Sequence, residues 1–166
     1  MMKFIETLFL GMLIACTALI AQVFVTVIAE LFFRITFVFQ YLPTDTLSHI
    51  ILLMLAAATI EELLRYLIIK KRTSLHVSNV SSVFIYGALL GIGFASFEAL
   101  LALFDNTISI SNLFMFAPVL IIHISLSIFL LFFIKSDNKI SQDALYIVAS
   151  IIIHTLSNLT LFYFFA

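Results

Sequence analysis

Residues Val80–Phe104 read VSSVFIYGALLGIGFASFEALLALF, an apolar stretch long enough to cross a bilayer as a helix, with Glu98 as its single charged residue. Gly87, Gly91 and Ala95 recur at intervals of four residues and therefore share one helix face. Small residues in this pattern let two membrane helices approach closely, and Glu98 continues that face one turn on. We therefore expect Glu98 to point at a neighbouring helix, and Gly91→Leu to disturb folding more than Gly11→Leu.

The whole chain has the composition of a membrane protein. Hydrophobic residues make up 64% of its 166 residues and charged residues 10%, whereas a soluble domain has about 25% charged residues. The apolar residues form long blocks and do not alternate with polar ones, which predicts helices and not a barrel. The sequence predicts an all-α, polytopic transmembrane helix bundle, with residues 1–166 as a single integral membrane domain. About five spans are expected, at roughly Phe4–Ala29, Leu47–Ile69, Val80–Phe104, Leu113–Ile134 and Asp143–Ala166.

The basic residues predict the orientation of the bundle in the cell membrane. In a drawing with five spans, one side holds Lys3, the Lys70–Arg72 cluster, Lys135 and Lys139. The loop sequences PTDT and DNTISISN on the other side contain no Lys or Arg, and Arg34, near the outer end of the first helix, is the exception and can pair with Glu30. The positive-inside rule then places the N-terminus in the cytoplasm and the C-terminus outside. No basic tract is long enough to indicate nucleic acid, so the bilayer is the expected surrounding.

Several ionisable residues fall inside the predicted spans, where a charge costs about 2.5–3.5 kcal/mol on insertion scales. Such residues are the first candidates for a functional site in a membrane protein. They are Glu61, Glu62 and Arg65 in the second span, Glu98 in the third, His123 in the fourth and His154 in the fifth.

The depths of these residues predict one shared site. At a rise of ~1.5 Å per residue, Glu62 lies ~12 Å, His154 ~16 Å and His123 ~18 Å from the cytoplasmic boundary. Glu98 lies ~20 Å deep in a core of ~30 Å. Arg65 can neutralise either Glu61 or Glu62 from the next turn, leaving the other carboxylate available.

Four motifs along the chain resemble those of the PrsW-like and YhfC-like membrane proteases. Ile60–Tyr66 (IEELLRY) is similar to their Glu-Glu-x-x-Arg/Lys motif. It is also similar to the Glu-Glu-x-x-x-Arg motif of CAAX proteases, but has one residue fewer before the Arg. Gly91–Glu98 (GIGFASFE) resembles the second motif, although Ala99 stands where the family usually has Asn. The family has a lone His in the next span, and His123 fits this position. His154–Asn158 (HTLSN) matches the last motif of the family, His-x-x-x-Asn.

The resemblance implies an intramembrane endopeptidase that cleaves a membrane-anchored protein or peptide. Glu61 or Glu62 would activate water, with His123 and Glu98 beside them, while His154 and Asn158 would stabilise the oxyanion and Arg65 would balance the Glu pair. This scheme requires no cofactor. The alternative is Zn²⁺ held by Glu62, Glu98, His123 and His154, although the HExxH pattern of many zinc peptidases is absent.

Two other functions are consistent with the same sequence. The fold also serves as a non-catalytic membrane scaffold, as in the similar APH-1 family, or as an immunity-type protein. A proton-coupled carrier would also place ionisable groups inside the membrane, but carriers commonly show repeated halves, which are not visible here. The requirement for Glu62 and His154 in a cleavage event distinguishes an enzyme from a scaffold.

Overall fold

The computed structural model describes residues 2–33, 47–73, 79–104, 110–135 and 140–165. These residues form five helices: α1 (Met2–Phe33), α2 (Leu47–Thr73), α3 (Val80–Phe104), α4 (Ile110–Lys135) and α5 (Ile140–Phe165). The all-α prediction is confirmed, and α3 has the predicted bounds. The other four helices extend by a few residues beyond at least one predicted boundary. The loops and Ala166 lie outside the described residues.

Four of these helices are long and apolar enough to cross a membrane: α1, α3, α4 and α5. Within the described residues α2 differs because Glu61, Glu62 and Arg65 interrupt its apolar sequence. These polar residues lie on a helix that packs against α1, α4 and α5.

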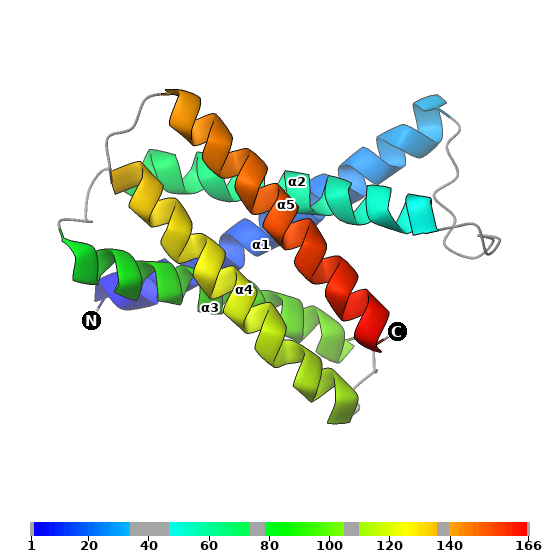
Figure 1. Cartoon of the computed structure of the whole chain (residues 1–166). Coiled ribbons are helices and arrows are strands. Elements are labelled where there is room, and N and C mark those ends of the chain that lie inside the picture. The colour runs from blue at the N-terminus through cyan, green and yellow to red at the C-terminus, as the bar shows by residue number, and fades with distance from the viewer. Residues whose placement is uncertain (1, 34–46, 74–78, 105–109, 136–139, 166) are drawn as a thin grey trace.

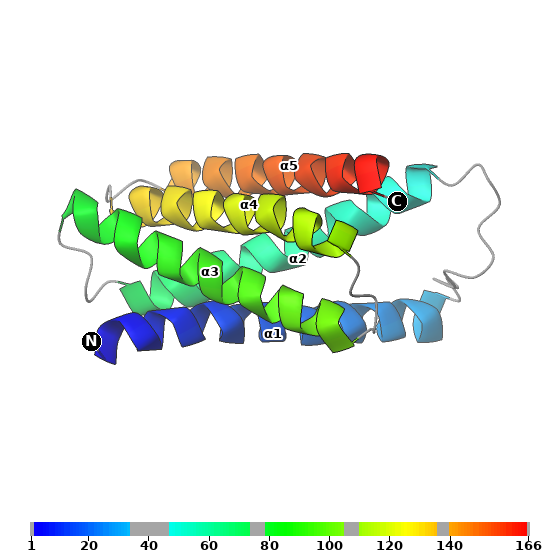
Figure 2. The same cartoon turned by 90° about the horizontal axis from the view of Figure 1, so that it is seen from below.

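The helices form a layered bundle. Figure 2 shows α4 and α5 side by side on one face and α1 on the opposite face, with α2 and α3 crossing between them. Successive helices run in opposite directions, so the N-terminus and the C-terminus lie at opposite ends (Figure 1). Helix α3 packs on both α4 and α1, and α2 packs on α5 and α1. This arrangement turns one face of each helix toward the centre of the bundle.

Glycines set the closest helix contacts. A Cβ atom on Gly91 would lie 2.4 Å from the Ile124 Cα of α4, and one on Gly11 would lie 2.2 Å from the Leu90 carbonyl oxygen of α3. Both contacts are with backbone, which cannot move aside as a side chain can. The expectation that Gly91 matters more than Gly11 is therefore wrong in its premise, because α1 also packs closely against α3.

Helix α3 has a defined start. The Asn79 side chain accepts hydrogen bonds at 2.7 Å from both the backbone N–H and the hydroxyl of Ser82. An Asn at this position satisfies a backbone donor that would otherwise lack a partner at the helix end. The cap defines where α3 begins.

Candidate active site

Two donors hold Glu62 at the centre of the bundle. Arg65 donates from Nη1 to Glu62 Oε1 at 2.6 Å, and His154 of α5 lies with Nδ1 at 2.9 Å from the same oxygen. All three side chains are buried. Because a carboxylate only accepts, the Nδ1 of His154 carries the proton, and Nε2 of the neutral ring presents a lone pair. Glu62 thus orients His154 with Nε2 available.

Arg65 extends this network to α4 and α3. Its Nη2 lies 2.8 Å from His123 Nδ1, and His123 Nε2 lies 2.8 Å from Glu98 Oε2. A guanidinium group only donates, so Nδ1 accepts and the proton of the neutral His123 ring lies on Nε2, where Glu98 accepts it. Phe94 stacks on the His123 ring at 4.4 Å between centroids. The expectation that Glu98 points at a neighbouring helix is confirmed.

Glu61 has a different environment from its neighbour Glu62, since consecutive residues point about 100° apart around a helix. Gln22 of α1 donates from Nε2 to Glu61 Oε1 at 2.8 Å. Glu61 Oε2 is buried, has no hydrogen-bond partner in the described part of the chain, and lies 3.5 Å from His154 Nε2. Two atoms that each carry a lone pair thus face one another, and a proton or a metal ion between them would satisfy both.

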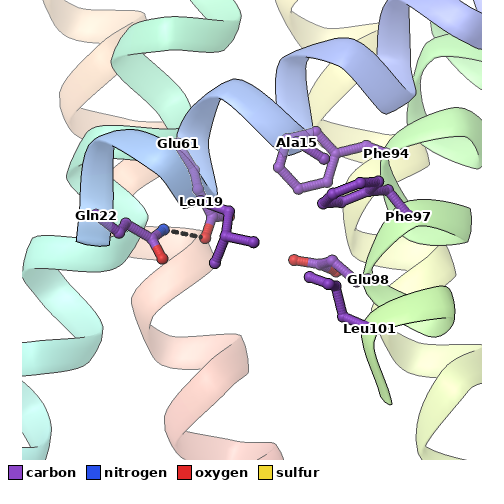
Figure 3. Close-up of a pocket in the computed structure, with 8 residues that line it drawn as sticks. All are labelled: Ala15, Leu19, Gln22, Glu61, Phe94, Phe97, Glu98 and Leu101. Atoms are coloured by element: carbon purple, nitrogen blue, oxygen red, sulfur yellow. Dashed lines mark hydrogen bonds between the residues drawn. The ribbon is translucent and has the colours of Figure 1, made fainter. Parts of the chain in front are cut away.

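A cavity of about 160 Å³ lies beside this cluster. Figure 3 shows Gln22 and Glu61 on one side of the cavity and the Glu98 carboxylate on the other. Since one water molecule occupies about 30 Å³ in the liquid, several waters fit between the two carboxylates. Helices α1, α2 and α3 line the cavity with Ala15, Leu19, Gln22, Glu61, Phe94, Phe97, Glu98 and Leu101.

The donor groups fit a catalytic metal ion. One ligand atom from each of Glu61, His123 and His154 lies within 4.8 Å of the others. Two imidazole nitrogens and one carboxylate oxygen form a ligand set of catalytic zinc sites, in which water takes the fourth position. The hydrogen bond from His154 Nδ1 to Glu62 is the outer carboxylate contact that commonly orients a metal-binding histidine.

This geometry changes the predicted ligand set. Sequence reasoning grouped Glu62, Glu98, His123 and His154 around the metal. In the structure Glu61 takes the place of Glu62, because Arg65 and His154 already occupy Glu62. Glu98 contacts His123 and lines the cavity, but it lies outside the compact donor group.

Asn158 lies one helical turn beyond His154 on α5 and is partly buried. The side chain makes no hydrogen bond with any described residue, and Asn158 does not line the cavity. Its predicted role in oxyanion stabilisation therefore stays a prediction.

Sequence reasoning missed Gln22, because this residue is uncharged and belongs to none of the four motifs. A signal for it exists: Gly11, Ala15, Ala18 and Gln22 lie at helical spacing, so that a polar residue continues a small-residue face. Glu98 continues the stripe of α3 in the same way.

A buried Glu/His cluster beside a water-sized cavity, within a bundle of membrane-spanning helices, is the arrangement of a membrane-embedded hydrolase. The model of the PrsW family intramembrane metalloproteases matches residues 5–164, so the chain belongs to this family. The protein is therefore an intramembrane protease, a peptide hydrolase that is integral to a membrane and acts on a protein or peptide. No curated protein and no solved structure gives a significant match to the chain.

Proposed function

We propose that the chain hydrolyses a peptide bond of a membrane-anchored protein or peptide in the cavity between Glu61 and Glu98, with Glu61, His123 and His154 as ligands of a Zn²⁺ ion. Such an ion, when bound, polarises the substrate carbonyl and makes a bound water more acidic. The observation that carries the proposal is the buried Glu61 Oε2, which has no hydrogen-bond partner among the described residues and faces His154 Nε2 at the edge of a cavity large enough for several waters.

Glu98 is the residue that we propose moves the proton. It lines the cavity, its side chain is 33% exposed, and one of its oxygens accepts from His123. Water adds to the carbonyl carbon and the C–N bond breaks; Glu98 takes the proton from the water and delivers it to the leaving amine. A carboxylate outside the ligand group can do this without giving up a ligand bond.

Glu62 and Arg65 serve in this proposal as positioning residues. Glu62 fixes the ring of His154 so that its Nε2 faces the site. Arg65 occupies His123 Nδ1, so a metal would bind at His123 Nε2 and would displace the proton that this atom donates to Glu98. Asn158 is kept as a candidate donor to the oxyanion from the turn above His154. From the similarity of IEELLR to the motifs of the CAAX and YhfC-like proteases, we also propose that the chain is related to these proteases.

The test is cleavage of a pool of single-span peptides in proteoliposomes, read by mass spectrometry. Glu61→Gln and Glu98→Gln should each lower cleavage by roughly 10² or more. Glu6→Gln is the matched control, because Glu6 lies near the start of α1 and is exposed. Cleavage at the rate of the unmodified protein by a Glu61→Gln, Glu98→Gln double variant would contradict the proposal and favour the scaffold alternative.

A further inference from the structure

Gln22 is the one uncharged polar residue among the described residues that line the cavity. It comes from α1, whereas Glu61 comes from α2. Its Nε2 donates to Glu61 Oε1 at 2.8 Å, and this is the hydrogen bond of Glu61 within the described part of the chain. The dashed line in Figure 3 marks this contact at the wall of the cavity.

We propose that Gln22 is a positioning residue for Glu61: its amide fixes Glu61 Oε1 and thereby turns Oε2 toward His154. The inference rests on the proposed function of Glu61 as a metal ligand. The Glu61 carboxylate can rotate about its terminal side-chain torsion. This rotation would exchange the two oxygens or move both away from His154. A hydrogen bond to one oxygen removes that freedom before the metal binds, as contacts around metal ligands commonly do.

The packing of α1 explains why Gln22 can act in this way. Gly11 and Gln22 are eleven residues apart, close to three full turns, so they lie on the same face of the helix. Gly11 packs against the Leu90 backbone, and Ala15 and Ala18 are buried on the same face. These contacts restrict rotation of α1, so the Gln22 amide stays at the level of Glu61.

The chemical nature of the side chain matters as well. Glu62 accepts one of its two hydrogen bonds from the cationic Arg65, which balances its charge. Glu61 receives one from a neutral amide, which orients the carboxylate while leaving its negative charge for a cation in the site. The two adjacent carboxylates are therefore prepared for different tasks by partners of different charge.

The first experiment measures Zn²⁺ affinity of the purified chain in detergent, with no substrate. Gln22→Leu should weaken Zn²⁺ binding by roughly 10- to 100-fold, the usual effect of losing a contact around a metal ligand. Thr26→Val is the matched control, because Thr26 lies one turn away, is exposed and bonds only to the backbone of Gln22. Its affinity should equal that of the unmodified protein. Unchanged affinity in Gln22→Leu, with binding lost in Glu61→Ala, would overturn the inference.

A second measurement separates this inference from the metal assignment. Melting temperatures of the metal-free Gln22→Leu, Glu61→Leu and double variants form a double-mutant cycle. Gln22→Leu should lower the melting temperature in the presence of Glu61 and cause no further drop when Glu61 is already replaced. If the unmodified chain binds no Zn²⁺, the metal assignment fails, and the cycle still decides on Gln22. Additive losses would show that Gln22 does not act through Glu61.

Discussion

Glu61 and Glu62 are adjacent in the sequence and both face His154, yet they accept hydrogen bonds from different residues. Glu62 is fully buried and accepts from Arg65 and His154, whereas Glu61 lines the cavity and accepts from Gln22. The two side chains point about 100° apart around the helix axis, and this angle places them in different environments. The sequence could show that one carboxylate of the pair would be neutralised by Arg65, but not which one, because both are within one turn of it.

Arg65 is the residue on which the buried network depends most. Replacing it with Ala would leave Glu62 without its cation and His123 Nδ1 without its donor, both in a dry interior. Loss of one partner of a buried ion pair costs roughly 3–5 kcal/mol. We expect Arg65→Ala to lower the melting temperature strongly in detergent, and Arg72→Ala, at the exposed end of α2, to leave it unchanged. Equal melting temperatures for the two variants would contradict this role.

At the scale of helices, glycine contacts on two faces hold α3 between α4 and α1. Gly91 faces the α4 backbone at Ile124, and Gly11 of α1 faces the α3 backbone at Leu90. The first contact brings Glu98 to His123, and the second brings Gln22 to the cavity beside Glu61. Both sides of the site therefore depend on close helix packing.

Leucine at either glycine should separate the helices. We expect Gly11→Leu and Gly91→Leu both to reduce the yield of folded protein severely, since the added side chain would meet backbone atoms at 2.2 and 2.4 Å. Ala56→Leu is the control, because Ala56 is exposed on α2. Monodisperse protein recovered by size-exclusion chromatography is the measurement. A normal yield from Gly11→Leu would show that α1 does not pack against α3 as described.

The helices and the polar residues within them could be predicted because each follows from local sequence. Apolar length defines α3, and the stripe of Gly87, Gly91 and Ala95 predicts the direction of Glu98. The partners of each polar side chain could not be predicted, because they depend on helix crossing. Gln22 reaches Glu61 only because α1 crosses α2 and α3 at a particular level, and nothing near Gln22 in the sequence specifies that level.

For the molecule as a whole, the helix ends that carry the basic residues lie together. The end of α2 and the start of α5 meet there: Lys70 bonds to Asp143 at 2.6 Å. The hydrogen bonds to Asp143 and to the Tyr66 hydroxyl raise the pKa of Lys70 to about 12, so this residue stays charged at neutral pH. Lys71 and Arg72 are exposed beside it. This concentration of positive charge supports a cytoplasmic location for that end.

The orientation can be tested with C-terminal reporter fusions in a bacterial host. We expect alkaline phosphatase at the C-terminus to be active and a fluorescent protein that matures only in the cytoplasm to be dark. The reason is that the C-terminus lies at the opposite end of the bundle from the last turn of α2 (Figure 2), which contains Lys70. The same fluorescent protein at the N-terminus should be bright and serves as the control. A bright C-terminal fusion would reverse the proposed topology.

Glu61, His123 and His154 form the metal centre of the active site in the function that we propose. Metal content and peptide cleavage measured on one purified preparation test it most directly. We predict about one Zn²⁺ per chain, lost together with cleavage on chelation and restored together with it when Zn²⁺ is added back, and absent from His154→Ala. Cleavage at the full rate by protein that contains no metal would contradict the account.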